Sequence, residues 1–146
     1  MEGKICTFFG HRDCPESVRG ALQALLEELI QKGVTVFYVG NEGNFDALVQ
    51  SVLRDLSARC PQICCLVVLA YLPKRETGGG LGTLLPEGIE TVPRRFAISW
   101  RNRWMLRRAD CAVVYVTHPS GGAAQFAGEA RRQGKPVCNL GGFEGF

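Results

Sequence analysis

The stretch Ala109–Gly134 constrains the fold most, because it reads as a strand, a glycine-containing turn and a helix in immediate succession. The apolar run Cys111–Val116 predicts a buried strand, and Ala123–Gln133 is predicted to be a helix. Thr117–Gly122 lies between them and supplies the turn. Since the start of a helix presents unpaired backbone N–H groups and a positive dipole end, we expect this turn to bind a phosphate or another anion.

The rest of the chain alternates strands with helices in the same way. Apolar runs rich in β-favouring residues predict further strands at Lys4–Phe9, Val34–Val39, Ile63–Ala70 and Pro136–Leu140. Helical spacing of apolar residues, with glycine and proline at the boundaries, predicts helices that contain Leu22–Ile30, Asn44–Ala58 and Pro93–Arg108. This alternation predicts an α/β protein with a Rossmann-like three-layer αβα fold. Its parallel five-stranded sheet is expected in the order 3-2-1-4-5, with strands numbered along the chain.

One irregular region, residues 71–92, interrupts the alternation. It contains charged residues and several glycines: Lys74, Arg75, Glu76, Gly78, Gly79, Gly80 and Gly82. We interpret it as a flexible Gly-rich insertion in a single domain that spans residues 1–146. A lid over a site and a segment without function are the two interpretations that the sequence leaves open.

The predicted strand order places a topological switch point between strands 1 and 4, where open α/β sheets bind ligands. The residues that follow strands 1, 2 and 4 are therefore the candidate ligand-binding and phosphate-binding residues: Gly10, His11, Arg12, Gly40, Asn41, Asp46, Thr117, His118, Ser120, Gly121, Gly122 and Ala123. Arg12 offers a planar fork of donors for a phosphate, and His11 can donate or titrate near neutral pH. Asp46 has two interpretations, as an acceptor for a ribose hydroxyl or as a partner of a helix dipole.

Composition excludes several classes of function. A net charge of +3 is too small an excess to indicate nucleic-acid binding by bulk charge. The sequence enters its first strand without a charged and then apolar leader, and the apolar run 63–72 is too short to span a bilayer. We therefore expect a cytoplasmic protein with no membrane partner.

The seven cysteines are odd in number and fall mostly in predicted strands, so we expect buried free thiols. Cys60 with Cys64 or Cys65 has the spacing of a zinc-binding pair, but no second pair or nearby histidine completes a site. We expect no metal and no cofactor. Cys14 has an alternative interpretation as a reactive thiol whose pKa a helix N-terminus lowers.

Three patches resemble the SLOG superfamily, the Rossmann-like group of the DprA/Smf proteins and the LOG phosphoribohydrolases, and particularly its small bacterial and phage members. The patches are TFFGHR at 7–12, GNEGNFDALV at 40–49 and the segment from Arg101 to Leu140. The resemblance implies the same fold and adds Arg101 and Asn102 to the candidate binding residues. The glutamate that acts in LOG enzymes corresponds to Phe126 in this chain, which leaves Glu129 and Glu42 as candidate catalytic residues.

The leading hypothesis is binding or sensing of a nucleotide or nucleotide-derived small molecule through phosphate-cradling loops. One alternative is a LOG-like N-glycosidase that acts on a nucleoside monophosphate. Another is a DprA/Smf-like module associated with single-stranded DNA through six arginines in 94–108, between which Trp100 and Trp104 either stack bases or pack the helix. The apolar helix faces and the GGFEGF tail, expected to fray or to form an interface, make a homodimer a further prediction.

Overall fold

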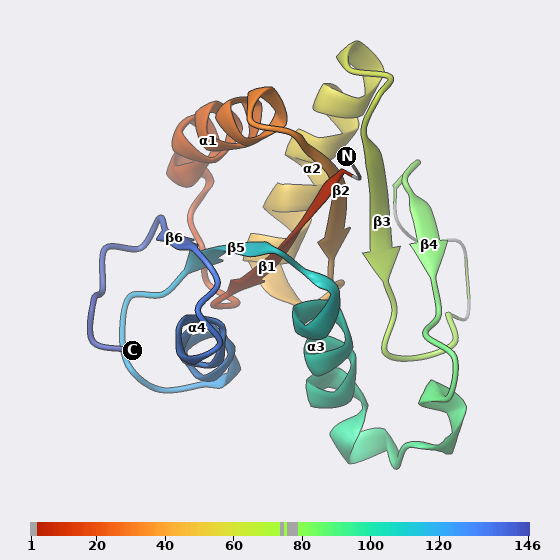
Figure 1. The fold of residues 1–146 in the computed structure, drawn as a ribbon. Helices are drawn as coiled ribbons and strands as arrows, with labels where there is room; N and C mark the ends of the chain where they lie inside the picture. The colour runs from red at the N-terminus through yellow and green to blue at the C-terminus, as the bar shows by residue number, and fades with distance from the viewer. Residues whose placement is uncertain (1–2, 74, 76–78) are drawn as a thin grey trace.

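The computed structural model describes residues 3–73, 75 and 79–146. In this part of the chain, six parallel strands form one sheet in the order β4-β3-β2-β1-β5-β6 (Figure 1). The strands are β1 (Lys4–Gly10), β2 (Val34–Val39), β3 (Cys64–Val68), β4 (Gly82–Leu84), β5 (Cys111–Tyr115) and β6 (Val137–Asn139). β1 and β5 are neighbours, so the switch point between the first strand and the strand that opens the 109–134 unit lies where it was predicted.

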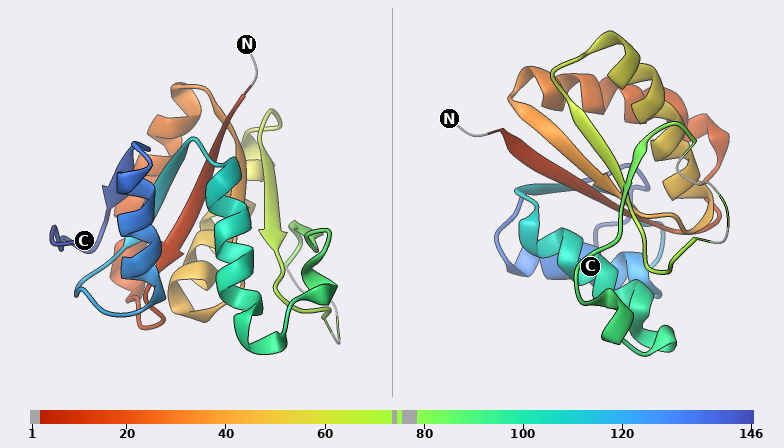
Figure 2. Two further views of the ribbon diagram at one scale, coloured as in Figure 1. Left: turned by 60° about the horizontal axis from the view of Figure 1, so that its bottom comes forward. Right: turned by 90° about the vertical axis from the view of Figure 1, so that its right-hand side faces the viewer.

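Helices cover both faces of the sheet, which confirms the predicted three-layer α/β fold (Figure 2). They are α1 (Arg19–Gln31) and α2 (Gly43–Arg59) on one face, and α3 (Ala97–Arg108) and α4 (Gly122–Arg132) on the other. Three short 3₁₀ segments accompany them: η1 (Glu16–Val18), η2 (Ile89–Thr91) and η3 (Arg94–Phe96).

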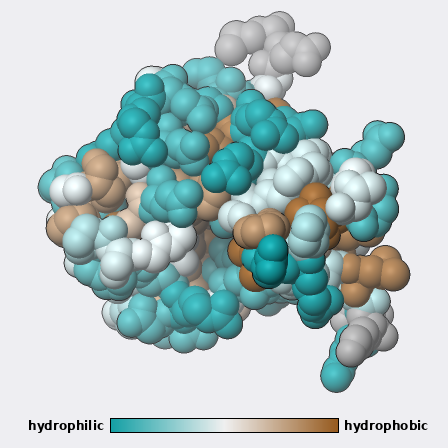
Figure 3. Space-filling view, turned by 90° about the horizontal axis from the view of Figure 1, so that it is seen from below, coloured by the Kyte–Doolittle hydropathy of each residue, from teal (hydrophilic) through white to brown (hydrophobic). Residues whose placement is uncertain are grey.

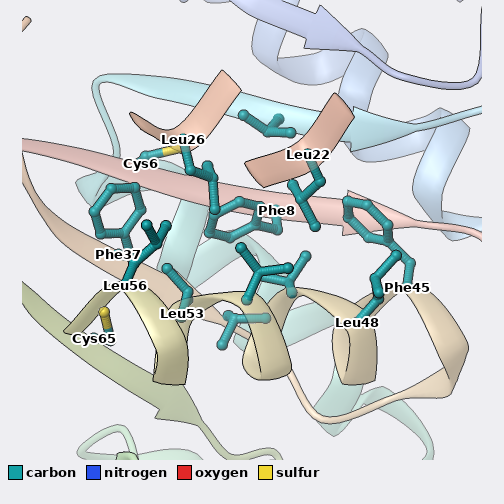
Figure 4. Close-up of a cluster of buried hydrophobic side chains, with 14 of the residues drawn as sticks. Cys6, Phe8, Leu22, Leu26, Phe37, Phe45, Leu48, Leu53, Leu56 and Cys65 are labelled. Carbon is teal, nitrogen blue, oxygen red and sulfur yellow. The ribbon is translucent and has the colours of Figure 1, made fainter. Parts of the chain in front are cut away.

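Successive residues of β1 point to opposite faces and anchor two hydrophobic cores. Phe8 packs between Leu22 of α1 and Leu53 of α2, with Phe37 of β2 stacked beside it (Figure 4). On the other face, the ring of Phe9 stacks on Phe126 of α4 at 5.4 Å. Because β1 is fixed from both sides, the backbone that leaves its carboxyl end is held in a defined position.

The sheet has six strands where five were predicted, and the region 71–92 contains regular elements. Residues 82–84 form β4, a sixth strand that pairs with β3, and Leu69 N donates to Leu84 O at 2.8 Å. η2 follows, and Ile89 is buried against Ala70 and Ala97. Lys74, Glu76 and Gly78, which the sequence analysis placed in this insertion, lie outside the described residues.

The C-terminal tail packs against its own domain, which contradicts the expectation that it frays. Phe143 and Phe146 contact the core between α3, α4 and the sheet, and the Arg131 guanidinium lies 4.0 Å from the centre of the Phe146 ring. Asn139 Nδ2 donates to Phe143 O at 2.7 Å, which ties the tail to the end of β6.

Burial of the thiols is only partly as predicted. All seven cysteines are free and Cys6, Cys14 and Cys65 are buried, but Cys64 and Cys138 are exposed. Burial raises the pKa of Cys14 to about 11, so the interpretation of Cys14 as an activated thiol was wrong. Among the described residues, no group of three or more His, Cys, Asp or Glu side chains is placed to hold a metal ion.

Candidate ligand-binding site

A cavity of about 440 Å³ opens at the carboxyl ends of β1 and β5. β1, β2 and β3 point downward in Figure 1, and the view from below in Figure 3 shows a hollow on this side, flanked by hydrophilic and hydrophobic residues. The cavity brings together most of the candidate residues: Gly10, His11, Arg12, Glu42, Asp46, Arg101, Asn102, His118, Ser120, Gly121, Gly122 and Ala123. Its volume falls in the range that small-molecule sites occupy.

The N-terminus of α4 forms one wall of this cavity. Gly121, the N-cap residue, has φ 94° and ψ 171°, a conformation that a residue with a Cβ adopts only at a cost. No side chain caps the helix; the Ser120 hydroxyl instead pairs with His118 Nδ1 at 3.0 Å. Gln125 N makes the first bond back to Gly121 O, so the amides of the first turn before it have no acceptor within the helix. They are available to an anion.

His11 forms a second wall, and its ring is held by two aromatic neighbours. The ring lies 3.9 Å from that of His118 and nearly parallel to it, and it meets Tyr115 edge-on at 6.3 Å. The His11 side chain is buried, with 8% of its surface exposed, and its Nε2 has no hydrogen-bond partner. Burial and the adjacent His118 lower the pKa of His11, which keeps the ring neutral near pH 7.

The loop after β1 is tied to the start of α2. Asn44 N donates to Arg12 O at 2.9 Å, and Arg12 Nη1 lies 3.7 Å from Glu42 Oε2. Gly43 has φ 82°, and a Cβ there would come within 2.8 Å of Arg12 Cα, so this close approach requires glycine. The Arg12 side chain is 75% exposed and extends from the rim of the cavity.

A buried carboxyl and a buried guanidinium lie at the floor. Asp46 Oδ2 accepts a hydrogen bond from Glu42 N at 2.9 Å, so it satisfies an amide at the start of α2. Arg101 is 1% exposed; its Nη1 donates to Val68 O at 2.8 Å and its Nε to Asn102 Oδ1 at 2.9 Å. Burial raises the pKa of Asp46 to about 6, opposed by the Glu42 amide and by Arg101.

Four candidate residues lie outside the lining of this cavity. Gly40 packs beneath the floor, where a Cβ would come within 2.8 Å of Asp46 Oδ2. Asn41 accepts a hydrogen bond from Gln50 Nε2 and lines a smaller neighbouring cavity. Thr117 is exposed on the loop after β5. Glu129 lies farther along α4, where its Oε2 is buried without a hydrogen-bond partner.

The cavity also has lining residues that the sequence analysis missed, namely Phe8, Phe9, Asp13 and Ile98. Asp13 directly follows the predicted His11 and Arg12, so adjacency alone was a signal for it. Phe8 and Phe9 were assigned to the core, and they are in the core; the cavity reaches the end of their strand. Ile98 lies in the first turn of α3, and its position depends on how that helix packs.

Comparison with known proteins finds solved structures of similar fold but no similar sequence. No protein-family model and no curated protein sequence matches the chain. Solved structures do: DNA processing protein A (DprA) from Streptococcus pneumoniae matches with a TM-score of 0.70 at 13% identity over 94% of this chain and 50% of that chain. DNA processing protein A from Helicobacter pylori matches with a TM-score of 0.65 at 13% identity over 93% of this chain and 64% of that one.

The Moco carrier protein from Chlamydomonas reinhardtii matches with a TM-score of 0.60 at 15% identity, over 96% of this chain and 77% of that one. The chain thus has the Rossmann-like fold of these proteins, as its resemblance to the SLOG superfamily implied. It spans about half to two thirds of the length of the two DprA chains. No helix in the described residues is both long enough and apolar enough to cross a membrane.

Proposed function

We propose that the chain binds a nucleotide or a nucleotide-derived small molecule in the cavity between β1 and β5, with a phosphate at the N-terminus of α4. The proposal rests on one juxtaposition. The uncapped first turn of α4 and His11, whose buried Nε2 has no hydrogen-bond partner, line the same cavity. A buried donor or acceptor without a partner is costly, and a ligand removes that cost. A phosphate supplies several acceptors for amides of this kind.

The arrangement favours a phosphate ester over a bare ion. Asp46 lies at the floor beside the anion site, and its carboxyl is an acceptor suited to a sugar hydroxyl. The cavity is far larger than a phosphate needs. A nucleotide places an anion, a hydroxylated sugar and a ring in sequence, which fits this succession of polar and apolar groups.

Calorimetry with a panel of nucleoside mono- and diphosphates tests the proposal. A Cβ on Gly122 would meet no atom within 4 Å, so Gly122→Val is expected to fold and to place its side chain over the first turn of α4. It should weaken binding at least tenfold, since an anion there approaches the backbone closely. Gly20→Val is the matched control, because Gly20 also has open space around its Cβ position but lies on α1. The absence of binding at millimolar ligand, or equal binding by both variants, would contradict the proposal.

The glycosidase alternative has less support. Of the two carboxylates named for it, Glu129 lies outside the cavity lining and Glu42 pairs with Arg12 at 3.7 Å. A general acid must come within hydrogen-bond reach of the leaving group. We therefore place binding ahead of hydrolysis.

A second candidate function, association with single-stranded DNA, is favoured by the distribution of charge. Residues 93–135 hold nine basic and two acidic residues, a net charge of +7 in a chain of +3. α3 and α4 share one side of the sheet, and all the arginines of this segment except Arg101 are exposed: Arg94, Arg95, Arg103, Arg107, Arg108, Arg131 and Arg132. The Arg108 guanidinium stacks on Trp104 at 3.9 Å, which is an arrangement that also suits bases.

The structure of DprA from Helicobacter pylori is described as showing a single-stranded DNA binding mode. Retention on a single-stranded oligonucleotide, measured over 50 to 300 mM salt, tests this function. We expect affinity to fall steeply with salt and to be lost when Arg107 and Arg108 are both changed to Glu. A protein that is not retained at the lowest salt would rule it out.

A further inference from the structure

A second cavity, of about 310 Å³, lies beside the candidate site and is mainly apolar. Ala70, Ile89 and Ala97 form a buried cluster beneath it. At its rim, Leu72 is 78% exposed and Leu85 is 38% exposed, although both are large apolar side chains. Isolated exposed leucines are common, but two at the mouth of one cavity make a surface that gains by being covered.

Shared lining residues connect this cavity to the anion site. A small cavity of about 130 Å³ lies between the two. Glu42 lines both the anion site and this intermediate cavity, while Ala70, Tyr71 and Leu72 line both the intermediate and the apolar cavity. Asn41 also faces the intermediate space. The path therefore runs from an anion site past carboxylate and amide groups to an apolar end.

Tyr71 is fixed at that apolar end. Its hydroxyl donates to Arg94 O at 3.2 Å, and the Arg94 guanidinium lies 4.2 Å from the centre of the ring. An aromatic ring that is already held in place loses little conformational freedom when a ligand packs against it. An aromatic ring in an apolar cavity is a common partner for a planar group.

We infer that the apolar cavity lined by Tyr71, Leu85 and Ala97 receives the planar ring of the ligand whose phosphate lies at the N-terminus of α4. This inference rests on the proposed function, because it assumes that a phosphate occupies the first cavity. The phosphate and the sugar then lie in the first cavity, with the sugar beside Asp46, and the ring extends past the intermediate cavity into the apolar one. The ligand class is a phosphate ester that carries a planar heterocycle.

The test compares probes with and without a ring. Binding of inorganic phosphate, ribose 5-phosphate, AMP and GMP is measured by calorimetry for the wild type and for Tyr71→Ala. We expect Tyr71→Ala to weaken the binding of AMP or GMP by about 5- to 150-fold, the usual effect of losing one base-stacking contact, and to leave that of ribose 5-phosphate within twofold. Phe96→Ala is the matched control, since Phe96 is half exposed but lies outside the three cavities.

A second variant guards against a trivial loss of folding. Leu85→Trp adds bulk at the exposed rim and should block nucleotides while it leaves ribose 5-phosphate binding intact. If both variants bind nucleotides as the wild type does, or lose all probes equally, the assignment of the ring is overturned while the anion site stands. If the wild type binds none of the phosphate compounds, the proposed function fails and this inference fails with it.

Discussion

Replacement of the buried carboxyl beneath the anion site, Asp46→Asn, should change how stability depends on pH. Asp46 is 7% exposed, and burial raises its pKa to about 6 from the ordinary 3.8. Between pH 3.8 and about pH 6, Asp46 keeps its proton in the folded protein, whereas the same carboxyl in the unfolded chain has released it. Folding is therefore stabilised by this proton at low pH, and the stabilisation is lost as the pH rises from about 4 to 6.

The magnitude follows from the pKa values. A tenfold change in a protonation equilibrium corresponds to about 1.4 kcal/mol, so a pKa near 6 in place of 3.8 corresponds to a cost of roughly 3 kcal/mol for the ionised carboxyl above pH 6. Asn cannot ionise, and its side-chain oxygen can still accept the hydrogen bond from Glu42 N. Asp46→Asn should therefore be more stable than the wild type at pH 7.5 by up to this amount.

Urea denaturation of both proteins between pH 4 and 8 measures the effect. Other groups titrate in both proteins, so the difference between the two free energies of unfolding isolates Asp46. It should grow from pH 4 to pH 6 and then stay level. Asp55→Asn is the control, because it removes a carboxyl that is exposed on the same helix. Parallel curves for Asp46→Asn would refute the assignment of a buried, costly carboxylate.

Three further results are expected from the same site. Sulfate, a dianion throughout this range, should bind about tenfold more tightly at pH 5.5 than at pH 8, because Asp46 is largely uncharged at the lower pH. Calorimetry at constant ionic strength would detect this difference, and an unchanged affinity would contradict it. Gly40→Ala should destabilise by about 1–3 kcal/mol in urea, since the added Cβ would lie 3.0 Å from Arg101 Cζ, and wild-type stability would show that the floor yields. Arg101→Met should cost about 1–3 kcal/mol by leaving the buried Val68 O without its donor, whereas an unchanged midpoint would show that water or backbone replaces it.

The sequence predicts those parts of the fold that depend on local patterns. The strand, glycine turn and helix at 109–134 are correct within one or two residues, because periodicity and turn chemistry are properties of neighbouring residues. β4 could not be predicted in this way. It is three residues long, and it exists only because Thr83 and Leu84 pair with Val67 and Val68 of β3. β4 is stabilised by this tertiary pairing, so no periodic pattern in the sequence indicates it.

The candidate site shows the same difference between features that follow from local sequence patterns and features that depend on tertiary packing. The backbone features, the loop after β1 and the start of α4, follow from strand order and could be located from the sequence. The side-chain geometry could not. The stacking of His11 on His118 joins two loops that are 107 residues apart, and the burial of Arg101 depends on the packing of α3 against β3. Glu129 shows the limit most clearly, because helical spacing from Phe126 gave its place along α4 but not the space that it faces.

The charges around the cavity bear on the proposed ligand binding. Arg12 pairs with Glu42, and Arg101 donates hydrogen bonds to Val68 O and Asn102 Oδ1. Both guanidinium groups therefore already have partners within the protein. The other donors at the cavity are uncharged groups, among them the backbone amides of α4 and the neutral His11 ring. Donors of this kind select by geometry and respond weakly to ionic strength, whereas the exposed arginines of α3 and α4 attract any polyanion and are screened by salt. The two candidate functions therefore belong to different faces and differ in physical character. We therefore expect proposed binding in the cavity to persist at high salt and proposed binding to the α3–α4 face to be lost.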